Sequence, residues 1–128
     1  MLNVVPTTFS TAVRGRHADC GDLISCEFVY HFHHASEGML VVLRGTPTVR
    51  MHDGDHQLRE GDVVGFPRGE EGGHQIRNEG DDPARILIVS TNADPDVAEY
   101  DSGKVGVWVA GTGRFFRLED AVEHSGPE

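Results

Sequence analysis

The 128-residue sequence contains one lysine, two cysteines and no long apolar run. Its eleven basic residues are scattered, which leaves no basic stripe for nucleic acid. No window approaches the roughly 18 to 20 apolar residues that a membrane span needs. The opening MLNVVPTTFSTAVRGR lacks a basic leader and a long apolar core, so we expect no signal peptide. We therefore expect neither nucleic acid nor a membrane as a partner.

The two cysteines, Cys20 and Cys26, are too few for a disulfide framework. We expect two reduced thiols in a cytoplasmic protein, with Cys26 as a small core residue. Acidic residues are plentiful, at 21 against 11 basic ones, and the net charge is -10. Such a surface mainly favours solubility.

Sixteen glycines and six prolines divide the chain into short β-type runs, and no linker or repeat interrupts them. The pattern predicts a single domain over residues 1–128. Leu118, Ala121 and Val122 have helical spacing and predict one or two helical turns near the C-terminus. The predicted strands cover residues 8–13, 23–33, 39–44, 46–52, 56–58, 62–67, 74–78, 85–91 and 105–109.

Many short strands joined by tight turns predict an all-β protein. A closed barrel or a double-sheet jelly roll is the expected architecture, because both leave few exposed sheet edges. We expect about 9 to 11 short strands in such a fold.

The stretch YHFHHASEGMLVVLRG concentrates histidines at the end of a predicted strand. Alternation along a strand places His31 and His33 on one face, one pleat apart, and His34 on the other. Two imidazoles at that spacing can reach one metal ion. His74 begins a distant predicted strand and is the candidate third ligand. An H-x-H pair alone is a weak signal, so the third histidine carries the hypothesis.

These residues belong to two spaced motifs. The first is His-x-His followed by Gly45, and the second is GDVVGFPRG followed by His74 and Asn78. In this pairing the chain resembles the cupin superfamily of small jelly-roll barrels, over about residues 23–91. The tail STNADPDVAEYDSGKVGVW is similar to that of an uncharacterised group of small single-domain bacterial cupins.

The resemblance implies a divalent metal, held by His31, His33 and His74 inside the barrel mouth. Three imidazoles suit zinc, iron, nickel or copper, and manganese also remains open. The family's glutamate ligand would fall at Gly38. Glu37 lies one position early and would face outward unless the strand bulges, so it is only a possible additional ligand. For Glu37, a solvated carboxylate at a strand end is the favoured interpretation.

The resemblance further implies that the barrel binds or transforms a small organic molecule. The sequence does not decide whether the protein is an enzyme. The alternative is a metal-free, non-catalytic module that binds a small molecule, and a third interpretation is a purely structural homodimer with a filled barrel. Trp108 and the pair Phe115–Phe116 are interpreted as core or dimer contacts rather than a substrate platform. An outward apolar row of Met39, Val41 and Leu43 predicts a homodimer.

Overall fold

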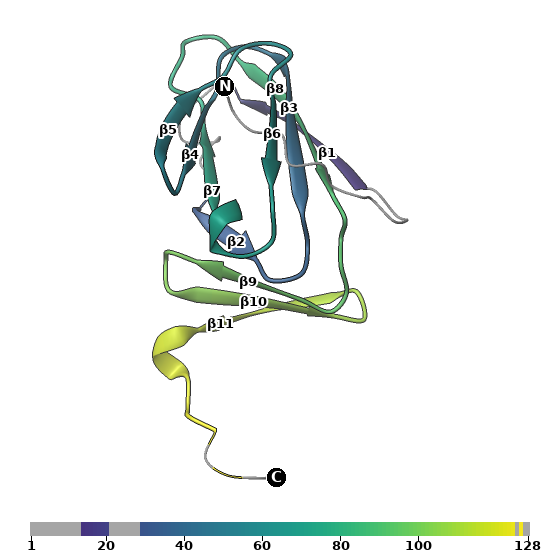
Figure 1. Cartoon of the computed structure of the whole chain (residues 1–128), viewed down its shortest axis with the longest axis vertical. Coiled ribbons are helices and arrows are strands. Elements are labelled where there is room, and N and C mark those ends of the chain that lie inside the picture. The colour runs from purple at the N-terminus through teal and green to yellow at the C-terminus, as the bar shows by residue number, and fades with distance from the viewer. Residues whose placement is uncertain (1–13, 21–28, 125, 127–128) are drawn as a thin grey trace.

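The computed structural model describes residues 14–20, 29–124 and 126. These residues form two antiparallel sheets and two short 3-10 helices (Figure 1). The two sheets confirm the predicted all-β jelly roll. The strands are β1 (Arg14–Cys20), β2 (His31–His33), β3 (Gly38–Arg44), β4 (Thr48–Met51), β5 (Gly54–Gln57), β6 (Val63–Phe66), β7 (His74–Arg77), β8 (Ala84–Ser90), β9 (Asp96–Tyr100), β10 (Lys104–Val109) and β11 (Thr112–Arg117); the helices are η2 (Glu70–Gly72) and η3 (Leu118–Asp120).

The smaller sheet has four strands in the order β1-β8-β3-β6. In β3, Leu40 and Val42 are buried, whereas the alternate residues Met39 and Val41 are only partly buried and Leu43 is exposed. This alternation confirms the predicted parity of the strand, with Leu40 and Val42 facing the barrel interior. The one register shift between β3 and β8 lies between Val42 and Arg44, so β3 does not bulge at its start.

The larger sheet has seven strands in the order β11-β10-β9-β2-β7-β4-β5. Strand β2 lies at its middle and pairs with β7 on one side and with β9 on the other. Within the part of the chain that the structure describes, β2 and β7 share a single register pair, His31 opposite His74. Strands β9, β10 and β11 extend the sheet beyond the barrel body towards the C-terminus (Figure 1).

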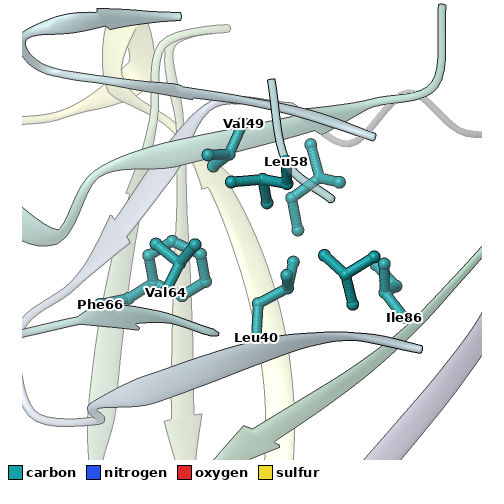
Figure 2. Close-up of a cluster of buried hydrophobic side chains, with 8 residues drawn as sticks. Leu40, Val49, Leu58, Val64, Phe66 and Ile86 are labelled. Carbon is teal, nitrogen blue, oxygen red and sulfur yellow. The ribbon is translucent and has the colours of Figure 1, made fainter. Parts of the chain in front are cut away.

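The core lies between the two sheets, where apolar side chains from both converge (Figure 2). Leu40 of β3 and Val49 of β4 are both 0% exposed, so the two sheets share one interior. Burying each such side chain contributes roughly 1.5 to 3 kcal/mol. Truncation of Leu40 to alanine would cost about 2 to 5 kcal/mol, because the surrounding strands cannot collapse into the cavity.

The loop between β6 and β7 contains helix η2 (Glu70–Gly72). Gly72 and Gly73 in this loop are packed so closely against other residues that no side chain would fit. A Cβ on Gly72 would clash with the Pro67 carbonyl oxygen, and a Cβ on Gly73 would lie 2.6 Å from the Tyr30 hydroxyl. The glycines therefore let this loop fold tightly and bring His74 back to the sheet.

Several sequence predictions need correction. Within the described residues, the predicted strand 23–33 is a strand only over His31–His33. Strands β9 and β11 were not predicted at all, and neither was β1. The predicted strand at residues 8–13 lies outside the described residues, as does Cys26. No helix in the part of the chain that the structure describes is long and apolar enough to cross a membrane.

The predicted C-terminal helical turns shrink to one short helix, η3 (Leu118–Asp120). Ala121 and Val122 follow it in an exposed segment, so their helical spacing does not reflect a packed helix. Without a surface to pack against, a short amphipathic segment gains little from forming further turns.

Candidate functional site

Three histidines that are distant in the sequence meet on the interior face of the seven-stranded sheet. His31 and His33 come from β2, and their ring centroids lie 5.3 Å apart. His74 comes from β7, and its ring centroid lies 4.8 Å from that of His31. The register pair of His31 with His74 explains this approach, because directly opposed residues project to the same side of a sheet. We call His31, His33 and His74 the histidine cluster.

Each ring of the cluster is held through the same nitrogen. Nδ1 of His31 donates to the carbonyl oxygen of Val29 at 2.8 Å, and Nδ1 of His74 donates to that of Gly72 at 2.8 Å. Nδ1 of His33 donates to the carboxylate of Asp96 at 2.8 Å. These acceptors require the proton on Nδ1, so in each neutral ring Nε2 carries a free lone pair.

Burial keeps two of these rings neutral. Burial lowers the pKa of His74 to about 3, and the neighbouring His31 and His33 act in the same direction, although the hydrogen bond to Gly72 opposes them. Burial also lowers the pKa of His31. Phe66 stacks on His74 with ring centroids 3.6 Å apart, which keeps water from that face of the ring. Two Nε2 lone pairs are therefore available at neutral pH.

Asp96 fixes the loop that follows β2 as well as His33. It is only 5% exposed, and its Oδ1 accepts hydrogen bonds from the amides of Ala35 at 2.9 Å and Val97 at 2.9 Å. Burial alone would raise the pKa of Asp96, but hydrogen bonds from Ser36, Ala35 and His33 hold it below its usual value. The carboxylate is thus charged and rigid, and it orients the His33 ring.

Glu37, the possible additional ligand, is not directed at the cluster. Arg68 donates to its Oε1 from Nη2 at 2.7 Å and from Nε at 3.0 Å. The bulge that would turn Glu37 inward does not occur at this end of β3. Position 38 does face the interior, since a Cβ on Gly38 would lie 3.7 Å from Cδ2 of Phe66.

The cluster supplies suitable donors for a metal but not a finished coordination sphere. Among the described residues, no group of three or more His, Cys, Asp or Glu side chains is arranged to hold a metal ion as it stands. The donor chemistry nevertheless fits one, because each histidine has Nδ1 anchored by an acceptor and Nε2 free, as metal-ligating histidines usually do.

Aromatic rings continue from the cluster along the same face. Tyr100 of β9 stacks on His31 with centroids 5.1 Å apart and an interplanar angle of 23°. Trp108 of β10 lies 5.9 Å from the ring of His33, and Phe115 of β11 lies 5.7 Å from Trp108. These contacts show that β9, β10 and β11 add an aromatic surface to the histidine side of the sheet. Trp108 is partly buried on this face.

His34, the neighbour of His33 in the sequence, lies on the opposite side of the sheet from the cluster. His34 is half exposed and contacts Glu99 through Nε2 at 2.6 Å, which agrees with its predicted outward position. An open hollow of about 620 Å³ lies away from the cluster, between β10, β11 and the segment after η3, and Phe116 and Leu118 are among its lining residues. The chemistry of the histidines, not the size of that hollow, identifies the candidate site.

A family model described as a cupin domain matches residues 25–90, just over half of the 128 residues. The chain belongs to the cupin domain family. No curated protein matches this cupin.

Two solved structures resemble this cupin over most of its length. One is a sugar phosphate isomerase of the cupin superfamily from Silicibacter pomeroyi, with a TM-score of 0.72 and 25% identity over 88% of this chain and 71% of that chain. The other is a proposed sugar phosphate isomerase from Acidithiobacillus ferrooxidans, with a TM-score of 0.72 and 26% identity over 89% of this chain and 71% of that chain.

A third structure supports the fold alone. It is an uncharacterised protein with a double-stranded β-helix domain from Klebsiella pneumoniae, with a TM-score of 0.53 and 22% identity. It covers 78% of this cupin and 82% of its own chain.

Sequence reasoning missed the residues that strand β9 contributes. Asp96 and Tyr100 lie on the histidine face because β9 pairs with β2, with His31 opposite Tyr100. The alternation in DVAEY was a usable signal, since Asp96, Ala98 and Tyr100 fall on one face of a strand. The run is short and mixes polar with apolar residues on that face, so its pattern does not predict a core strand.

Proposed function

We propose that this cupin binds a divalent metal through Nε2 of His31, His33 and His74, and that it binds or isomerises a small phosphorylated sugar in the barrel. The observation that carries the proposal is the shared anchoring of the three rings by Nδ1. An acceptor at every Nδ1 sets the tautomer that leaves Nε2 ready for a metal. The sugar phosphate comes from the two similar structures named above.

Each residue has a role in this proposal. A bound metal would supply a Lewis acid that polarises a carbonyl or hydroxyl of the ligand. Asp96 holds His33 in one orientation, and the stacked ring of Tyr100 does the same for His31. Phe66 shields His74 from water, which keeps its ring neutral.

Metal analysis tests the proposal directly. The untagged full chain is stripped with chelator and then titrated with zinc, manganese, iron(II), nickel and copper by calorimetry. We expect about one ion per chain, with binding lost in His31→Ala and His74→Ala. His34→Ala is the matched control, because His34 lies on the same segment but contacts Glu99 outside the cluster. Absence of binding for all five metals would overturn the metal proposal.

Activity is measured separately. Wild type loaded with metal is incubated with aldose and ketose phosphates, and interconversion is followed by proton NMR with exchange from deuterated water. Isomerisation that requires the histidines supports an enzyme, whereas binding without turnover supports a binding protein.

A metal-free role is the second candidate, and two observations favour it. Gly38 stands where the family has its glutamate, and Glu37 is engaged by Arg68. In this case the cluster would bind a small ligand by hydrogen bonds from and to its imidazoles. Ligand binding that persists in the chelated protein would support this candidate over the metallo-cupin.

We also propose that the protein is a homodimer. Met39 and Val41 lie on the outer face of the four-stranded sheet, and Leu43 beside them is 47% exposed. Leu87 and Val89 of β8 stand opposite Val41 and Met39 in register, which widens the apolar row. A contiguous apolar face of this kind favours association with a second copy.

A further inference from the structure

The interior face of the seven-stranded sheet continues past the histidine cluster in regular rows. His31 pairs with Tyr100 across β2 and β9. The turn between β9 and β10 is closed by the Gly103 amide donating to the Tyr100 carbonyl oxygen at 3.0 Å. Val105 of β10 stands opposite Glu99 of β9, and extending this register by one residue places Lys104 opposite Tyr100. Lys104 in turn pairs with Arg117 of β11.

A second row starts from His33. It pairs with Ala98, Ala98 pairs with Gly106, and Gly106 pairs with Phe115. Because directly opposed residues project to one side of a sheet, the side chains of both rows share the histidine face. The ring contacts of Trp108 with His33 and with Phe115 agree with this assignment.

The indole of Trp108 lies over Gly106 and Gly113, and it can do so because these two residues have no side chain. A Cβ on Gly106 would lie 2.6 Å from Cη2 of Trp108, and a Cβ on Gly113 would lie 2.5 Å from its Nε1. The indole thus rests against the strand backbones beside His33, with Phe115 edge-on to it at 82°. An aromatic surface beside the hydrogen-bonded pair of His33 and Asp96 suits the ring or carbon chain of a polyhydroxylated ligand.

Lys104 provides the cation of this face. It is exposed, and within the described residues no ion pair engages it. Arg117 beside it is engaged, since its Nε donates to Asp120 at 2.9 Å and Nη1 lies 3.6 Å from Glu119. The charge of Arg117 is therefore offset, whereas that of Lys104 is available. Among the described residues on this face of β10 and β11, Lys104 is therefore the cation that no carboxylate offsets.

The spacing between Lys104 and the cluster suits a small phosphorylated molecule. Lys104 lies two strands from His31, or about 10 Å between backbones at the usual strand spacing. The long side chain of lysine can bend over that surface and bring its ammonium closer. A ligand with oxygens at the histidines could thus place a terminal phosphate at Lys104.

We propose that the histidine face of β9, β10 and β11 is the ligand subsite, with Trp108 and Phe115 contacting the carbon skeleton and Lys104 the phosphate. The inference deepens the proposed function and rests on it for the ligand class. It does not depend on a metal, because no residue of the subsite belongs to the histidine cluster.

The single tryptophan of the chain is a reporter for this subsite. The full chain, with and without chelator, is titrated with glyceraldehyde 3-phosphate, ribose 5-phosphate and glucose 6-phosphate while Trp108 emission is recorded. Glucose and inorganic phosphate are the ligand controls. We expect a saturable change with at least one sugar phosphate and a markedly weaker response to glucose. No saturable response to any sugar phosphate would overturn the subsite.

Charge variants separate the subsite from nonspecific attraction. Lys104→Gln should weaken sugar phosphate binding about tenfold or more, since a charge-assisted hydrogen bond is lost. Arg114→Gln is the matched control, because Arg114 is an exposed cation of β11 that pairs with Val107 on the opposite face. Arg114→Gln should bind as wild type does. Equal affinity of Lys104→Gln and wild type would overturn the role of Lys104.

The aromatic contact is tested by calorimetry, since Trp108→Leu removes the fluorophore. Its circular dichroism spectrum and thermal transition show whether it folds, and Lys104→Gln tests the subsite independently if it does not. The subsite and metal proposals fail separately. Sugar phosphate binding that survives in His74→Ala contradicts only a metal requirement, whereas a metal-loaded protein that ignores every sugar phosphate contradicts only the subsite.

Discussion

His33 donates a hydrogen bond from Nδ1 to Oδ2 of Asp96 across 2.8 Å, which ties β2 to β9. The Asp96→Asn variant would place an amide NH₂ beside Nδ1, because the other side-chain position is fixed by the amides of Ala35 and Val97. The His33 proton would then move to Nε2 and block the lone pair. We expect metal affinity to fall about 10- to 100-fold, measured by competitive titration.

Glu99→Gln is the control for that variant. Glu99 contacts His34 on the other side of β2, so its neutralisation should leave metal affinity unchanged. An Asp96→Asn protein that folds and binds metal as tightly as wild type would show that His33 does not bind through Nε2.

Glu37 should not contribute to metal binding. Its carboxylate is held by Arg68 through Nη2 and Nε, away from the cluster. Glu37→Ala should therefore change the metal dissociation constant by less than about threefold, because no ligand is removed. Competitive titration with zinc and manganese measures this. A large loss of affinity would show that Glu37 leaves Arg68 and joins the metal.

Gly38 offers a place for a carboxylate ligand. A Cβ there would meet Val89 O at 3.4 Å and Phe66 Cδ2 at 3.7 Å, which are ordinary contacts, so a larger residue can start along this path. Gly38→Glu should tighten binding of manganese or iron(II) more than of copper, because carboxylates favour harder ions. It should also weaken binding of any ligand that uses the open position. A variant that folds normally without gaining affinity for any divalent ion would show that a side chain at position 38 does not point towards the histidine cluster.

Acid should destabilise the metal-free protein through His74. Its pKa is about 3 when folded, so in the unfolded chain, where histidine titrates near pH 6.5, it binds a proton more readily. The stability from neutral His74 is fully present above about pH 6.5 and is lost as the pH falls towards 3. Between pH 7.5 and pH 5 we expect a loss of about 2 kcal/mol from this residue, measured by urea unfolding.

His74→Asn removes that titration and should flatten the same pH profile. His52→Asn, at an exposed turn position, should retain the wild-type slope. If the slopes of wild type and His74→Asn coincide, burial of a neutral His74 does not govern acid sensitivity.

The outer face of the four-stranded sheet should mediate dimer formation. Val41→Asp places a charge in the middle of the partly buried row formed with Met39 and Leu87. We expect light scattering to give twice 14.0 kDa for wild type and one chain mass for Val41→Asp. Arg44→Asp, an exposed change at the end of the same strand, should remain dimeric. A wild type that is monomeric at micromolar concentration would contradict the assembly.

Strand parity made much of the barrel predictable. The burial of Leu40 and Val42 and the outward position of His34 both follow from alternation along a strand, which local sequence contains. The proximity of His74 to His31 came from the family motif, since nothing local links residues so far apart. Position 38 likewise faces inward as its parity requires.

The parts that could not be predicted depend on pairing between distant strands. Asp96 becomes the partner of His33 only because β9 aligns against β2, and that register is set by long-range packing. The capture of Glu37 by Arg68 joins two loops in the same way. Trp108 was interpreted as a core or dimer contact, because a lone tryptophan gives no sign that Gly106 and Gly113 will let its indole lie beside His33.

The single register pair between β2 and β7 gives the histidine cluster a mechanical significance. The seven-stranded sheet consists of β7, β4 and β5 on one side of that boundary and β2, β9, β10 and β11 on the other. Among the described residues, His31 and His74 are the one register pair across it. Local unfolding should separate the described part of β2 from β7 first, because few backbone hydrogen bonds hold these two strands together. An ion bound by both imidazoles would link β2 to β7, and amide hydrogen exchange near residues 31 and 74 should slow when the ion is bound.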